Sequence, residues 1–190
     1  DPIRAAGPVA ARLAEQTGFA VAIALWGNFG PTVVRMIEAR QPLLVAIRAG
    51  TVMSLFGTAT GRAFAAALPP AQLFEAAAGL ATPVGGPPAT ARPGVEAGLT
   101  KAEEDLVGRA RRDVQRHGVV RAEGQPIPGV NAFSAPCLDG EGKPALVITL
   151  LGHQDKLPVS WDSAGAQAVR AAAAEISSHL GWHPLRSARS

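Results

Sequence analysis

The segment 19–25 alternates large and small apolar side chains, and this alternation restricts the fold more than any other feature of the sequence. The large residues are Phe19, Val21, Ile23 and Leu25, and each residue between them is alanine. Because successive side chains of a β-strand point to opposite faces of its sheet, the pattern predicts a strand buried on both faces. Its alanine face allows a neighbouring layer to approach closely. Such a strand needs a sheet that is covered on each side.

Further strands are predicted on the C-terminal side of this segment. Turn residues follow it at 27–31, and a Gln41–Pro42 break divides the next apolar stretch, so an antiparallel meander is expected. The turn residues at 139–143 predict a hairpin late in the chain. The predicted strands cover residues 32–39, 43–48, 119–120, 130–137 and 145–151.

Helical patterns occupy most of the remaining sequence. Thr100 and Glu103 have the spacing of a capping box, and the helix that follows is expected to end before Gly118. Residues 1–17 repeat apolar side chains with a helical period and stop at Gly18. One antiparallel sheet with helices on its faces follows from this order, an α+β sandwich. The other predicted helices cover residues 58–68, 71–78 and 164–180.

The sequence predicts a single domain. Between Gly79 and Gly98, five glycines and four prolines fall within twenty residues, a composition typical of a surface loop. The segment after this loop has too few strands for a core of its own. We therefore expect one domain over residues 1–184 and a flexible tail over 185–190.

Composition excludes several classes of protein. No apolar run approaches the roughly 20 residues of a membrane-spanning helix, so no membrane partner is expected. The 18 basic residues exceed the acidic residues by only 3 and are spread along the chain, which does not favour direct binding of DNA. Cys137 is the only cysteine and cannot form an internal disulfide; it is expected to be a small buried side chain.

The segment 57–62, Gly-Thr-Ala-Thr-Gly-Arg, is the first candidate for a binding site. It is not a P-loop, because only three residues separate its glycines and alanine follows the arginine. Small residues at a helix start leave backbone N–H groups that can hold a carboxylate or phosphate oxygen. In the alternative interpretation, the hydroxyl of Thr58 or Thr60 caps the helix and satisfies these donors.

Thr149 is the one polar residue in the apolar strand 146–151, so its hydroxyl needs a partner if it is buried. Asn131 and Ser134 lie on the predicted neighbouring strand, and polar groups on adjacent strands can converge on a small ligand. A hydrogen bond to a nearby backbone group is the alternative.

Neither a catalytic residue nor a metal site is predicted. Ser134 lacks the Gly-x-Ser-x-Gly motif of a serine nucleophile, and nothing in the sequence places a base beside it. His179 and His183 have a metal-like spacing, but Gly181 breaks the helix that would align them, and no third ligand is evident.

Three segments, taken in order, resemble the effector-binding domain of the IclR family of transcriptional regulators. The most specific is 128–139, with the pattern Gly-Val-x-Ala-x-x-Ala-Pro followed by Asp139; the others are 57–70 and 148–152. The opening helix and first strand are also similar, so the resemblance covers nearly the whole chain. It implies a GAF-like, cytoplasmic domain without catalysis or cofactor. A small metabolite, often an organic or aromatic acid, would change its homodimer or tetramer, and DNA would be reached only through an N-terminal winged helix that is absent from this chain.

The resemblance also implies a pocket between the sheet and the loop before the short helix. A carboxylate would meet the N–H groups of residues 59–61 and be oriented by Thr149, with apolar residues, among them Trp26, around its body. The apolar character of Ala132 and Leu151 favours a larger, more apolar acid. The expected ligand-binding residues are Met53, Leu55, Ala59, Thr60, Gly61, Ala132, Ser134, Thr149 and Leu151.

Two other functions remain open at the level of sequence. A ligand-free association domain would have a closed core with no cavity near Thr60 and Thr149. A small hydrolase would use Ser134 or Cys137 and would need a base.

Overall fold

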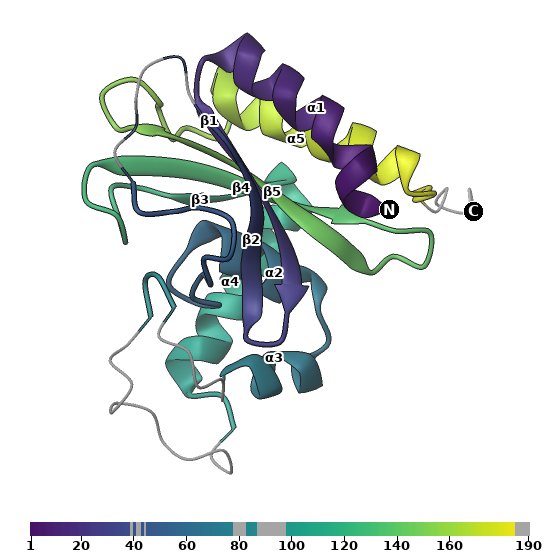
Figure 1. Cartoon of the computed structure of the whole chain (residues 1–190). Helices are drawn as coiled ribbons and strands as arrows, with labels where there is room; N and C mark the ends of the chain where they lie inside the picture. The colour runs from purple at the N-terminus through teal and green to yellow at the C-terminus, as the bar shows by residue number, and fades with distance from the viewer. Residues whose placement is uncertain (39, 41–42, 44, 78–82, 87–97, 185–190) are drawn as a thin grey trace.

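The computed structural model describes residues 1–38, 40, 43, 45–77, 83–86 and 98–184. Five strands form one sheet in the order β2-β1-β5-β4-β3, and every neighbouring pair is antiparallel (Figure 1). The α+β fold predicted from the sequence is confirmed. The strands are β1 (Ala20–Gly27), β2 (Gly30–Ile37), β3 (Val120–Ala122), β4 (Val130–Leu138) and β5 (Pro144–His153).

Helices cover both faces of the sheet (Figure 1). On one face lie α1 (Pro2–Thr17) and α5 (Ala164–His179), side by side. On the other face α2 (Ala59–Ala67) packs against β4 and β5, and α4 (Lys101–His117) packs against α2. The predicted capping box is present, because the side chains and N–H groups of Thr100 and Glu103 bond reciprocally. Helix α3 (Pro70–Ala77) follows α2 as expected.

The alternation in β1 separates two apolar clusters as predicted. Val21 and Ile23 are fully buried in the cluster formed with α1 and α5. The alanines at 20, 22 and 24 belong to the cluster on the side of α2 and α4. The side chains of the central strand β5 alternate between the same two clusters. Ile148 and Leu150 lie toward α1 and α5, and Val147 and Leu151 lie on the opposite face.

The predicted strand at 43–48 is wrong: none of its described residues is in a strand. The edge of β2 is taken instead by residues 50–53, through bonds from Gly50 N to Val33 O and from Met53 N to Pro31 O, 2.7 and 2.8 Å long. The apolar side chains of Leu43, Val45 and Ile47 pack on the α2 side of the core. These side chains are therefore buried by packing, although their backbone does not form the hydrogen bonds of a strand.

Most of the predicted loop at 79–98 and the whole predicted tail at 185–190 lie outside the described residues. Within the loop, residues 83–86 are described, and Val84 forms a parallel bridge with Met53. Its N–H donates to Val52 O and its carbonyl accepts from Ser54 N, at 2.9 and 2.8 Å. The loop was expected not to pack as an element, but this part of it is attached to residues 52–54.

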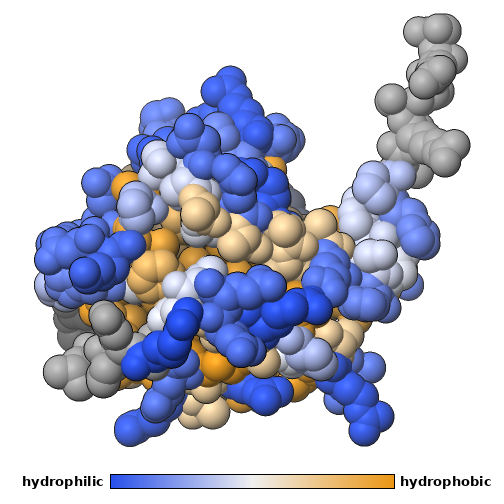
Figure 2. Space-filling view, turned by 90° about the horizontal axis from the view of Figure 1, so that it is seen from above, coloured by the Kyte–Doolittle hydropathy of each residue, from blue (hydrophilic) through white to orange (hydrophobic). Residues whose placement is uncertain are grey.

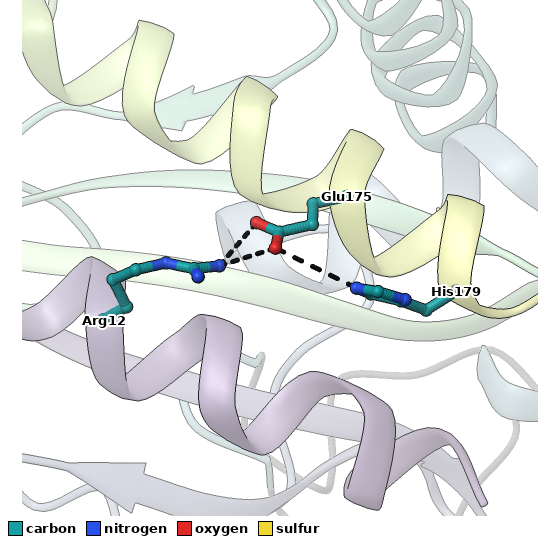
Figure 3. A network of polar contacts seen from close by, with 3 residues as sticks. All are labelled: Arg12, Glu175 and His179. Carbon is teal, nitrogen blue, oxygen red and sulfur yellow. Dashed lines mark hydrogen bonds and ion pairs between the residues drawn. The ribbon is translucent and has the colours of Figure 1, made fainter.

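An ion pair links the exposed sides of α1 and α5 (Figure 3). Arg12 Nη2 donates to both carboxylate oxygens of Glu175 at 2.6 Å, and His179 Nε2 lies 3.9 Å from the same carboxylate. Both side chains of the ion pair are about half exposed, so it contributes at most about 1 kcal/mol. None of the helices in the described part of the chain has the length and hydropathy needed to span a membrane.

The reactivity of Cys137 tests whether the face of the sheet under α5 is packed as described. Its side chain is fully buried, and burial raises the pKa of the thiol to about 12. Because the thiolate is the reactive form, we expect almost no labelling by a disulfide reagent at pH 8 in the native protein and rapid labelling in guanidinium. The raised pKa also means that the free energy of unfolding should fall as the pH rises above the ordinary thiol value. Rapid labelling of the native protein would contradict this packing.

Candidate functional site

The start of α2 is fixed by a close approach of backbones. A Cβ atom on Gly61 would lie 1.9 Å from Ser54 O and 2.7 Å from Leu55 Cα, so only glycine fits this position. The Thr58 hydroxyl donates to Ser54 O at 2.7 Å and accepts from Gly61 N at 2.9 Å. These contacts hold the first turn of α2 against the turn that precedes it.

A small cavity of about 20 Å³ opens between this first turn and strands β4 and β5. Its volume is enough for a water molecule but not for an organic acid. No charged side chain is among the residues around it, all of which the structure describes. The cavity is lined by Met53, Thr58, Ala59, Thr60, Ala122, Gln125, Pro126, Ile127, Val130, Ala132, Thr149 and Leu151.

Three buried hydroxyl groups form a chain beside the cavity. Thr149 Oγ1 lies 2.8 Å from Thr60 Oγ1 and 2.6 Å from Ser134 Oγ. The three hydroxyl groups carry three protons, but only two hydrogen bonds join them. One proton is therefore left without an acceptor among the described residues. Ser134 does not line the cavity, and its proton is satisfied only when it points to Thr149. The remaining proton then belongs to Thr60 or Thr149, both of which line the cavity.

The backbone donors of α2 are only partly available. Gly61 N–H is taken by Thr58, and Arg62 N–H donates to Thr58 O at 3.0 Å. The predicted donation from Gly61 to a ligand is therefore wrong, and the capping alternative holds for Thr58. The N–H groups of Ala59 and Thr60 lie in the first turn, where no carbonyl of the helix can accept from them.

Six of the nine predicted site residues line the cavity, and three do not. Leu55 lies beneath Gly61, and Ser134 reaches the site only through Thr149. Trp26 packs edge-on against Phe64, with ring centroids 5.5 Å apart, and is not part of the wall. The six that line the cavity are Met53, Ala59, Thr60, Ala132, Thr149 and Leu151.

The loop 125–127 is a part of the wall that the sequence did not indicate. Pro126 lies close to Gly85, because a Cβ atom on Gly85 would be 2.9 Å from Pro126 Cγ. The described segment 83–86 therefore supports this side of the wall. Proline and glycine at these positions of the sequence predict only turns. The sequence also does not indicate that Thr58, Ala122 and Val130 line the cavity. For Thr58 it predicts only a capping role.

The charged residue of the segment 57–62, Arg62, does not line the cavity. Arg62 donates to the carbonyl oxygens of Phe56 and Arg121, at 3.1 and 2.8 Å, and so ties α2 to β3. Burial lowers the pKa of its guanidinium group. Among the described residues, no group of three or more His, Cys, Asp or Glu side chains is placed to hold a metal ion.

A family model for the C-terminal domain of bacterial IclR transcriptional regulators matches residues 1–178. The chain belongs to the IclR family. This membership confirms the resemblance of its motifs, and the family consists of transcriptional regulator domains rather than enzymes. A search of curated protein sequences found no match.

Solved structures of IclR-family proteins have the same fold. HmgR of Pseudomonas aeruginosa is 26% identical with a TM-score of 0.75, over 96% of this chain and 68% of that one. IclR of Thermotoga maritima is 19% identical with a TM-score of 0.75, over 96% and 69% of the two chains. The repressor BlcR of Agobacterium tumefaciens is 20% identical with a TM-score of 0.69, over 97% and 68%. About a third of each of these proteins therefore lies outside the match.

Replacing Gly61 by alanine tests the backbone contact that positions α2. The new Cβ would overlap Ser54 O, so we expect the free energy of unfolding to fall by about 3 kcal/mol. Gly108→Ala in α4 is the matched control, since its nearest neighbour is a flexible arginine atom at 3.5 Å. That variant should gain about 0.5–1 kcal/mol. Denaturant titration measures both, and equal effects would argue against the contact.

Proposed function

We propose that this chain is the effector-sensing domain of a bacterial transcriptional regulator and that it binds a small organic acid at the Thr60–Thr149 cavity. One observation carries the proposal: the three linked hydroxyl groups have one proton more than the two hydrogen bonds between them use, and two of these groups, Thr60 and Thr149, line the cavity. A carboxylate oxygen is the acceptor that such a buried donor favours most. Membership of the IclR family supports the same function.

The ligand's charge would be balanced without a charged side chain. The N–H groups of Ala59 and Thr60 and the positive end of the α2 dipole can hold a carboxylate beside the hydroxyl donor. Apolar side chains, including Met53, Ile127 and Leu151, would enclose the rest of the molecule. This wall offers few partners for additional hydroxyl groups, so it favours an aromatic or otherwise apolar acid.

Binding would require the wall to open. A pocket for an organic ligand usually measures at least about 300 Å³, far more than the 20 Å³ of this cavity. The loop 125–127 is an irregular part of the wall, and the segment 83–86 that supports it is held by two backbone hydrogen bonds of Val84. The ligand-binding state would then be a minor one, and the effector would act by its preference for that state.

In the complete regulator, effector binding would alter a homodimer or tetramer and thereby the affinity for DNA of a separate winged-helix domain, in the cytoplasm. The domain itself would not catalyse a reaction, because Ser134 is bonded to Thr149 and no base adjoins it in the described residues. The small cavity favours one competing function, a ligand-free association domain.

A thermal-shift screen against small organic and aromatic acids distinguishes the two functions. An acid at about a hundred times its dissociation constant adds ~2.7 kcal/mol to stability, or several degrees for a domain of this size. One coherent chemical class of stabilising acids would support the sensor. A folded protein that none of the acids stabilises would favour the association domain.

Two variants test the assignment of the spare proton, using the most stabilising acid. The double variant Thr60→Val, Thr149→Val keeps the shape and the backbone N–H groups but removes both hydroxyl groups that line the cavity, so we expect the affinity to fall at least about tenfold. Ser134→Ala still leaves one spare proton on the Thr60–Thr149 pair. It should lower stability by about 1 kcal/mol and change the affinity less than about threefold.

Calorimetric titration and chemical denaturation measure these two effects separately. An affinity that the double variant leaves unchanged would contradict the proposed role of the hydroxyl groups at the cavity. Equal losses of affinity in both variants would indicate a general disturbance of the core.

A further inference from the structure

The outer face of α1 carries an ordered stripe of four exposed residues. Arg4, Pro8, Ala11 and Glu15 follow one another at spacings of four, three and four, which places them along one line of the helix. The opposite face is buried in the core beneath α1 and α5. In Figure 2, which views the molecule from above Figure 1, pale apolar surface crosses the middle of the face between hydrophilic side chains.

The two charges at the ends of this stripe lack partners. Neither Arg4 nor Glu15 forms a side-chain hydrogen bond or ion pair with the described part of the chain, whereas Arg12 on the same helix pairs with Glu175. Arg4 and Glu15 are eleven positions apart along the helix, a distance of about 16 Å. The two side chains therefore cannot neutralise each other within one molecule.

A groove of about 480 Å³ runs beside the stripe, between the N-terminal half of α1 and β2. Arg4 and Arg35 both line it, with Gly7, Pro8 and Ala11 as its small residues. A Cβ atom on Gly7 would lie 2.8 Å from Arg35 Nη1, so this glycine gives the guanidinium room against the helix. The groove thus carries two guanidinium groups and the Asp1 carboxylate beside a surface that another helix can approach closely.

We propose that this stripe binds α1 of a second copy of the chain in antiparallel orientation. With Pro8 of one copy opposite Ala11 of the other, Arg4 of each copy lies opposite Glu15 of the other. Each contact then occurs twice, as a two-fold axis requires. The small central residues allow the helix axes to approach to about 8–10 Å. Parallel packing would instead place Arg4 against Arg4, so the order of the charges selects the antiparallel arrangement.

The test is an exchange of charges measured by sedimentation equilibrium. Arg4→Glu makes both ends of the stripe acidic and Glu15→Arg makes both basic, so each variant alone should dimerise at least about tenfold more weakly than the wild type. An equimolar mixture of the two variants restores both opposite-charge contacts in a heterodimer. We expect its dissociation constant to lie within about twofold of the wild-type value. The double variant Arg4→Glu, Glu15→Arg should recover in the same way.

The control is Arg112→Glu, the same change of charge on the exposed side of α4 across the sheet, which should leave dimerisation unchanged. Circular dichroism and thermal unfolding establish that each variant is folded. A wild-type chain that stays monomeric, single variants that dimerise normally, or a mixture that does not recover would each overturn the proposal. The result does not depend on effector binding, because no ligand is present in these measurements.

Discussion

The burial of the sheet on both faces is the constraint from which the candidate site follows. In a strand with two covered faces, a polar side chain has no access to bulk water and must find a partner inside the protein. Thr149 is such a residue on the central strand β5, and it takes Thr60 of α2 and Ser134 of β4 as partners. The same hydrogen bonds that satisfy Thr149 therefore join a helix to two strands and place hydroxyl groups at the cavity.

Periodicity in the sequence predicted which face of β1 each side chain occupies, because that depends only on the two-residue repeat of a strand. It failed at 43–48, where apolar residues pack on the core while residues 50–53 take the edge of β2. A hydrophobic pattern indicates that a segment is buried, but it does not indicate which segment forms hydrogen bonds with the edge strand. That outcome depends on the turn at Arg48–Thr51, which returns the chain to β2.

The residues that line the cavity were mostly anticipated from the sequence where they lie on regular elements and were missed where they lie on the loop 125–127. Family motifs located residues on α2, β4 and β5, since the spacing within an element fixes its geometry. They did not indicate the loop 125–127, whose position against Gly85 is a long-range contact. They also assigned Gly61 to the ligand, whereas its role is to let α2 approach residues 54–55. A small residue beside a pocket can serve packing as well as binding.

The cavity and the α1 stripe lie on opposite sides of the sheet, and this arrangement limits how one can influence the other. On β5, Thr149 faces the cavity, while its neighbours Ile148 and Leu150 belong to the cluster beneath α1 and α5. Packed interiors have little free volume, so a displacement of Thr149 would have to move these neighbours. An acid could therefore bias the packing of α1 only if it opens the wall in a way that shifts β5. An acid admitted by movement of residues 83–86 and 125–127 alone would bind without changing the dimer.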